Sequence, residues 1–189
     1  MSGFRPSRSI VSGEQISSYK SANDTGGGFD GAASVTVYVN KTNGEILTTI
    51  LVDIQDLLVS GTVKDIIGED GVAAAYLTQI TTAVNGIIYK AEMACIEAPA
   101  GSNTTADIDL VSNSASLAED AEYDGSGTAV ALIPATGAYT AGMVRFTAVG
   151  TDFSNCVDDY LYLANGSGSN SGGTYTAGKF IIKLYGASF

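Results

Sequence analysis

The sequence contains no histidine and no tryptophan among its 189 residues, and each absence excludes a class of function. Without histidine there is no Ser-His-Asp or Cys-His catalytic set and no histidine-ligated metal site. Without tryptophan there is no indole to stack on a sugar ring, which argues against a glycoside hydrolase with paired carboxylates. The chain also lacks a Gly-x-Ser-x-Gly elbow, a phosphate-binding Gly-x-x-x-x-Gly-Lys-Ser/Thr loop and a dinucleotide glycine fingerprint. We therefore expect a protein that is not an enzyme, has no catalytic residues and binds no cofactor.

Charged residues are scarce, and most of them are acidic. They make up 15% of the chain, and 20 acids against 9 bases give a net charge of −11. An average soluble domain has about 25% charged residues. A surface with so few charges is typical of a protein that is covered by copies of itself or by a partner. A nucleic-acid-binding protein needs a concentrated basic patch, and an anionic membrane would repel this chain, so we expect neither as a partner.

Cysteine is nearly absent as well. Cys95 and Cys156 lie far apart in the sequence, each in or beside an apolar run. We expect two buried free thiols, although a disulfide between them stays open. Residues 1–29 lack the apolar core of a signal peptide, and no apolar run approaches the ~18 residues of a membrane span. We therefore expect synthesis in a cytoplasm.

Alternating apolar and polar residues predict β-strands from Ser34 onward. The clearest pair is residues 34–40 and 45–54, which alternate on either side of an Asn43-Gly44 turn and predict a β-hairpin. Further strand patterns occur at residues 105–111, 128–133, 142–149, 159–163 and 178–185. About eight or nine strands without convincing helices predict an all-β fold, an antiparallel, jelly-roll-like β-sandwich over residues 34–189.

The stretch from Asn85 to Leu110 is predicted to be the centre of an antiparallel sheet. Residues 87–97 alternate, and one parity, expected to be buried, holds Ile87, Tyr89, Ala91, Met93 and Cys95. Asn85-Gly86 would join this strand in a second hairpin to residues 72–84. The segment Ala98-Pro99-Ala100-Gly101 would end it, because proline removes a backbone donor.

Residues 1–33 differ from the rest in showing no strand or helix period. Serines are frequent in this segment, which ends in a glycine-rich run. We expect an extended or flexible N-terminal arm, either disordered or ordered only where it lies on another subunit. The residues predicted to bind the partner are apolar and basic: Phe4, Arg5, Arg8, Ile10 and Val11.

Carboxylates are the remaining groups able to carry chemistry. Glu119, Asp120, Glu122 and Asp124 crowd into one polar loop and are weak candidates for calcium ligands. The loop lacks the glycine and the closing glutamate of a calcium-binding loop. A solvated acidic loop is therefore the favoured interpretation, and we expect no metal.

Several short segments resemble a class of small virion proteins from tailed phages, particularly marine ones. They are Gly44–Ile50 (GEILTTI), Val63–Gly68 (VKDIIG), and Gly86–Lys90 with Glu97–Ser102. Such proteins are capsid decoration or cement proteins, β-rich and often trimeric, that bind outside the phage head at junctions between capsomers. The resemblance implies a non-enzymatic structural protein on the capsid surface of the virion. Its implied partners are the major capsid protein and other copies of itself, with a homotrimer favoured.

Two other interpretations stay open. The chain could be a tail or head-fibre component, or it could be a ligand-binding β-sandwich. The latter would be a carbohydrate or calcium-dependent adhesion module that uses the loops Glu119–Asp124 and Ser167–Gly173. The ten tyrosines, most of them in or beside predicted strands, favour a binding surface, since tyrosine is enriched at protein interfaces. We expect several of them at subunit contacts.

Overall fold

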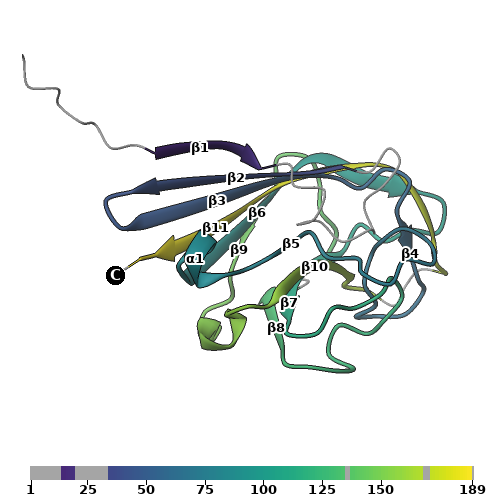
Figure 1. The fold of residues 1–189 in the computed structure, drawn as a ribbon. Coiled ribbons are helices and arrows are strands. Elements are labelled where there is room, and N and C mark those ends of the chain that lie inside the picture. The colour runs from purple at the N-terminus through teal and green to yellow at the C-terminus, as the bar shows by residue number, and fades with distance from the viewer. Residues whose placement is uncertain (1–13, 20–33, 135–136, 168–170, 189) are drawn as a thin grey trace, which may run out of the picture.

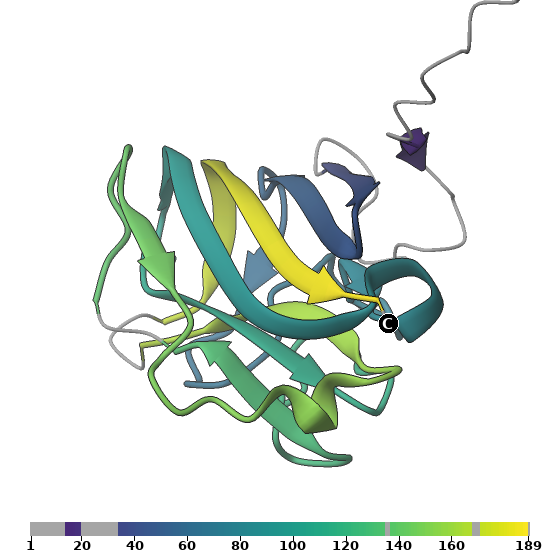
Figure 2. The ribbon, with the colours of Figure 1, turned by 90° about the vertical axis from the view of Figure 1, so that its left-hand side faces the viewer.

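The computed structural model describes residues 14–19, 34–134, 137–167 and 171–188 (Figure 1). Two antiparallel sheets pack face to face in these residues, which confirms the predicted all-β sandwich. Figure 2 shows the two layers from one end of the strands. No helix in these ranges has the length and apolar character needed to cross a membrane.

The larger sheet has seven strands, and the smaller sheet has four. The larger sheet runs, in spatial order, β1 (Glu14–Tyr19), β2 (Ser34–Thr42), β3 (Glu45–Asp53), β11 (Gly173–Ala187), β6 (Ile87–Gly101) and β9 (Val144–Phe146), and β4 (Leu58–Val59) pairs with the start of β11. The smaller sheet runs β5 (Thr78–Gln79), β10 (Tyr160–Asn165), β7 (Ile108–Asn113) and β8 (Ala129–Ile133). Two short turns, α1 (Thr82–Asn85) and η2 (Phe153–Cys156), complete the elements.

The first predicted hairpin is confirmed. Strands β2 and β3 pair from Thr42 opposite Glu45 to Ser34 opposite Asp53. Asn43 and Gly44 both have positive φ angles, 51° and 84°, as the tight turn between such strands requires. Alternate residues of both strands are buried against the smaller sheet.

The second predicted hairpin is wrong. Within residues 72–84 the structure has only β5, which belongs to the smaller sheet, followed by the start of α1. The Thr81 hydroxyl caps this turn by accepting a hydrogen bond from the Val84 amide (3.3 Å). The Asn85 side chain accepts one from the Thr81 amide and donates one to Thr48, each at 2.8 Å. Asn85-Gly86 therefore ends a helical turn, because local caps outcompete strand pairing here.

Strand β6 also departs from its predicted pattern. Lys90 pairs with Tyr185 while Ile88 pairs with Gly186, so Tyr89 is an extra residue in a β-bulge. The bulge reverses the parity of the strand, so Ile88 is buried while Ile87 and Tyr89 are exposed. The predicted end at residues 98–101 is wrong too. The strand continues through Pro99 to Gly101, because irregular pairing with β11 around Pro99 tolerates the missing donor.

The main core fills the space between the sheets with inward-facing residues of both. Among its members are Ile50, Met93, Phe180 and Leu161, all at most 1% exposed. Cys95 and Cys156 are both buried and free, as expected of structural thiols.

The N-terminal segment contributes one strand. Regular structure was expected to begin near residue 33, but β1 lies within the predicted arm and pairs antiparallel with β2, Glu14 opposite Lys41. The predicted partner-binding residues Phe4, Arg5, Arg8, Ile10 and Val11 lie outside the described residues.

Candidate interaction surface

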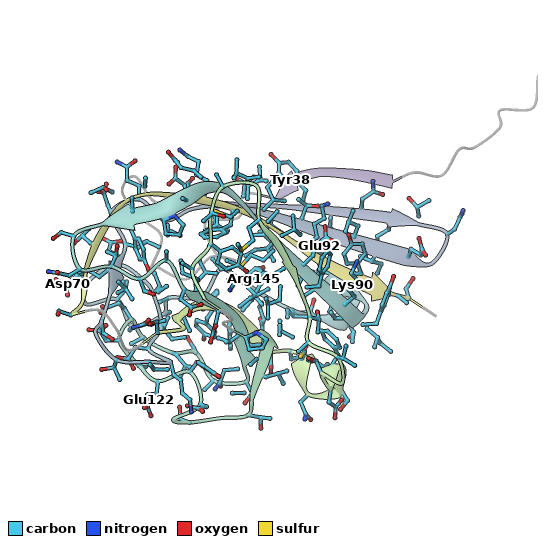
Figure 3. All side chains as sticks on the ribbon, turned by 180° about the vertical axis from the view of Figure 1, so that it is seen from behind. Tyr38, Asp70, Lys90, Glu92, Glu122 and Arg145 are labelled. Carbon is cyan, nitrogen blue, oxygen red and sulfur yellow. The ribbon has the colours of Figure 1, made fainter. Side chains whose placement is uncertain are left out.

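The four carboxylates of the predicted acidic loop do not converge on one point. Asp124 forms an ion pair with Lys64 (2.5 Å), while Glu119 hydrogen-bonds Asp120. In Figure 3, Glu122 projects from the lower layer at some distance from Asp70. Among the residues that the structure describes, no three cysteine or carboxylate side chains lie close enough to hold a metal ion. The loop therefore does not present the convergent oxygens that calcium needs.

A buried polar set lies beneath the smaller sheet, and it resembles a nucleophile with its partners. The Ser112 hydroxyl donates to Asp159 Oδ2 (2.8 Å) and lies 3.5 Å from Cys156 Sγ. All three side chains are at most 2% exposed, and burial raises the pKa of both the Cys156 thiol and the Asp159 carboxyl. Raised pKa values and full burial make an inert thiol rather than a nucleophile.

Arg145 is the second buried polar centre, and it reaches from β9 into the space between the layers (Figure 3). Its guanidinium stacks 4.2 Å from the centre of the Tyr139 ring and lies 3.7 Å from Asp107 Oδ1. It also donates to the backbone carbonyls of Gly137 and Ala138. Burial raises the pKa of Tyr139 to about 12. These contacts hold the segment before β9 against the core.

The accessible feature is a sheet face, which we call the outer face. It comprises the residues of β2, β3, β11, β6 and β9 that point away from the smaller sheet. Strand register arranges them in four rows: Ser34, Asp53, Lys179 and Glu97; then Thr36, Leu51, Ile181, Ala94 and Val144; then Tyr38, Thr49, Lys183, Glu92 and Phe146; then Asn40, Leu47, Tyr185 and Lys90. Ile96 and Tyr89, in the irregular stretches of β6, extend the first and last rows.

The outer face gathers exposed apolar side chains. Eleven large apolar residues are exposed over the described ranges, and six belong to it: Tyr38, Leu51, Tyr89, Ile96, Val144 and Phe146, at 38–56% exposure. A groove of about 320 Å³ opens between the strands, lined by Leu51, Ile96 and Ile181. Soluble proteins seldom leave a contiguous apolar patch open unless it binds something.

The charges of the outer face neutralise one another. Lys179 bridges Glu97 (2.7 Å) and Asp53 (3.5 Å), and Lys183 pairs with Glu92 (2.8 Å). Burial acts to raise the pKa of Glu92, but hydrogen bonds from Lys183, Tyr185 and Lys90 outweigh it and hold this pKa below its usual value. Three lysines thus meet three carboxylates in the four rows.

Lys90 connects these ion pairs to the aromatic residues. Its ammonium lies 3.5 Å from Glu92, 4.4 Å from the centre of the Tyr185 ring and 5.3 Å from that of Phe146. The Tyr89 and Tyr185 rings are 6.5 Å apart. A cation over aromatic rings is a stabilising contact, so these interactions hold this corner of the face in place.

Sequence reasoning found part of this surface. The tyrosines divide between core and surface: Tyr139, Tyr162 and Tyr175 are buried, whereas Tyr38 and Tyr89 lie on the outer face. The apolar residues of the face were missed. Their signal is present in the sequence, because β3 (EILTTILVD) and β11 (…FIIKLY…) carry apolar residues on both parities. A strand with one wet face should carry them on one parity only.

Comparison with known proteins supplies no relative. No protein-family model, no curated protein and no solved structure matches the chain.

Proposed function

We propose that this chain is a non-enzymatic virion structural protein that decorates the phage capsid and binds the major capsid protein outside the shell. The observation that supports this proposal best is the outer face, an open apolar surface with neutralised charges on an otherwise acidic chain. Such a surface serves protein–protein binding, and in a decoration protein that includes contacts between its own copies. The buried Ser112, Cys156 and Asp159 do not offer a substrate an accessible reactive group. The resemblance of residues 44–102 to decoration proteins points to the same class.

The mechanism is stabilisation by binding. A protein that binds the assembled shell but not its free subunits shifts the equilibrium toward the shell by about RT ln(1 + [L]/Kd). At a free concentration 100 times Kd this amounts to about 2.7 kcal/mol per site. Copies of the chain would contact each other as well as the shell. The arm residues Phe4, Arg5, Arg8, Ile10 and Val11 would tether the domain to its neighbours.

Composition of purified particles tests the class of function. Quantitative mass spectrometry should find hundreds of copies per particle relative to the major capsid protein. A few tens of copies would indicate a tail or head-fibre component instead. If the chain is missing from particles, the virion proposal is wrong and the ligand-binding sandwich becomes the leading interpretation.

Two truncations test the role of the arm. Deleting residues 1–13 leaves β1 and the whole sandwich intact, so the melting temperature should not change while binding to shells weakens. Deleting residues 1–30 also removes β1 and opens the edge of β2. Binding to purified shells, measured by co-sedimentation, should fall in both variants. Shell binding that survives the shorter deletion would show that the first thirteen residues are no tether.

A further inference from the structure

We propose that the outer face binds a second copy of this chain, so that two larger sheets pack back to back around a two-fold axis. The inference does not depend on the virion assignment, since it rests on the charge, area and edges of the sheet alone. One face that contacts the same face of its partner is the ordinary geometry of a two-fold dimer.

The distribution of charge selects this face. The four rows of the outer face hold three lysines and three carboxylates, with Glu45 just beyond the last row. Outside the four rows, the described residues from 34 onward hold 14 acids, Glu45 included, and 3 bases. Two such molecules repel one another wherever their acidic surfaces meet, and the outer face is where the repulsion is least. A basic partner would be drawn to the acidic surfaces instead, so the neutral face fits another neutral face.

Its ion pairs remain satisfied when the face is covered. Each lysine of the outer face already has a carboxylate within 2.7–3.5 Å in its own chain. Covering a paired charge costs much less than covering an unpaired one. The apolar row of Leu51, Ile181, Ala94 and Val144, by contrast, gains from losing its contact with water.

The size of the face matches a modest dimer. Five strands about 4.8 Å apart, with rows spanning seven residues at about 3.3 Å each, give a surface of about 24 by 20 Å. Covering it on two copies removes about 1,000 Å², the lower limit of specific interfaces. We therefore expect dissociation in the micromolar range, about 1–100 µM.

The edges of the larger sheet offer less surface for association than its outer face does. Its two edge strands, β1 with six residues and β9 with three, are shorter than the nine residues of β2 and β3. Short edge strands offer few backbone groups for pairing with another chain. Association through the face rather than by extension of the sheet follows from this arrangement.

A matched pair of variants tests the proposal. Val144 lies on the outer face and Val157 follows η2, yet both are valines with 44% exposure. We expect the full chain to be a dimer by sedimentation equilibrium at about 200 µM, and Val144→Glu to weaken the dimer at least tenfold. Val157→Glu, with the same added charge, should dimerise like the wild type. Because repulsion between acidic copies is screened by salt, raising the ionic strength should tighten the wild-type dimer.

Further controls keep the outcome decisive. Ile96→Lys, on another strand of the same face, should also weaken the dimer, which guards against misfolding of one variant. Unchanged far-ultraviolet circular dichroism would show that each variant folds. A wild-type monomer at this concentration, an oligomer indifferent to Val144→Glu, or the homotrimer that the family resemblance implies would overturn the proposal. An outer face protected from hydrogen exchange only when shells are added would show that the capsid occupies it instead.

Discussion

The two sheets of the sandwich differ in how many of their faces the chain itself covers. Every residue of β7 is buried, and so is every residue of β10 after Tyr160, so the smaller sheet is covered on both sides. In β2, β3 and the second half of β11, buried residues alternate with exposed or half-buried ones. Within the described residues, the larger sheet is therefore covered on its inner side only.

The cover of the smaller sheet comes from the chain's own loops. A second apolar cluster, separate from the main core, packs Ile66, Ala75 and Leu117 from these loops against Val111, Tyr162 and Ala164 of β7 and β10. The loops run roughly from residue 60 to 77 and from 114 to 128. Long loops usually stay on the surface because their backbone groups need hydrogen-bond partners. These loops therefore need side chains that bond their backbone, which we call clips.

Buried polar side chains are those clips. The Tyr162 hydroxyl accepts from the Leu117 amide (2.9 Å) and donates to the Ala115 carbonyl (2.8 Å). The Asn113 amide donates to the carbonyls of Tyr123 and Ser126, and Asn165 donates to those of Ser60 and Thr62. No comparable loop lies over the outer face in the described residues. The two sheets thus differ in their cover, since the described residues bury both faces of the smaller sheet but only one face of the larger sheet.

The largest expected effect is on stability, and it compares a core residue with an outer-face residue of the same strand. Ile181 and Ile182 are neighbours in β11, but Ile182 points into the core and is fully buried, whereas Ile181 lies on the outer face. Ile182→Ala should lower the free energy of unfolding by about 2–5 kcal/mol, because it leaves a cavity. Ile181→Ala should cost less than about 1 kcal/mol in the monomer, since its site already contacts water. Urea denaturation at low protein concentration measures both, and equal losses would show that the outer face is not open.

A smaller loss is expected from releasing a clip over the smaller sheet. Asn113→Ala removes two donated hydrogen bonds of 2.6 Å and the one that Asn113 accepts from the Ala115 amide. Because the Asn113 side chain is buried and makes three hydrogen bonds, we expect this loss to cost about 1–3 kcal/mol. The matched control, Asn155→Ala, changes an exposed residue of η2 and should stay within about 0.5 kcal/mol of the wild type.

Hydrogen exchange separates local from global loosening in Asn113→Ala. Amides around residues 114–128 should exchange faster than in the wild type, while those of β3 and β11 keep their relative protection. Uniform acceleration across both sheets would contradict the idea that Asn113 acts as a clip for these loops.

The alternating strands of the larger sheet were predictable from the sequence, whereas the cover of the smaller sheet was not. The β2–β3 hairpin follows from period-two alternation around Asn43-Gly44, and both are local. Buried polar residues such as Ser112 and Asp159 look like loop or turn residues in the sequence, because they hydrogen-bond each other across 47 positions. Their role depends on tertiary contacts that no window of sequence contains.

The site was predictable only in its residue types. Tyrosines were expected in or beside strands, and Tyr38 and Tyr89 lie on the outer face. The bulge at Tyr89 reverses parity within β6, however, and no alternation rule finds a bulge. The hairpin strand predicted over residues 72–84 was wrong for a related reason. The Asn85 side chain prefers a distant partner, Thr48, and that contact favours a helical turn over a hairpin.

The smallest expected effect concerns a charge in the loops that cover the smaller sheet. Burial raises the pKa of Glu119 to about 7, helped by the hydrogen bond and charge of Asp120 and by Asp70. A carboxyl whose folded pKa is raised binds its proton more tightly in the folded state, so its contribution to stability is complete below about 4.5 and is lost as pH rises through 7. The chain has no histidine, so few other groups titrate between pH 5.5 and 8. The melting temperature should therefore rise by about a few degrees from pH 8 to pH 5.5, and Glu119→Gln should abolish most of that rise. If the variant kept the full pH dependence, Glu119 would not be its source. The acidic loop would then be solvated, as its composition predicts.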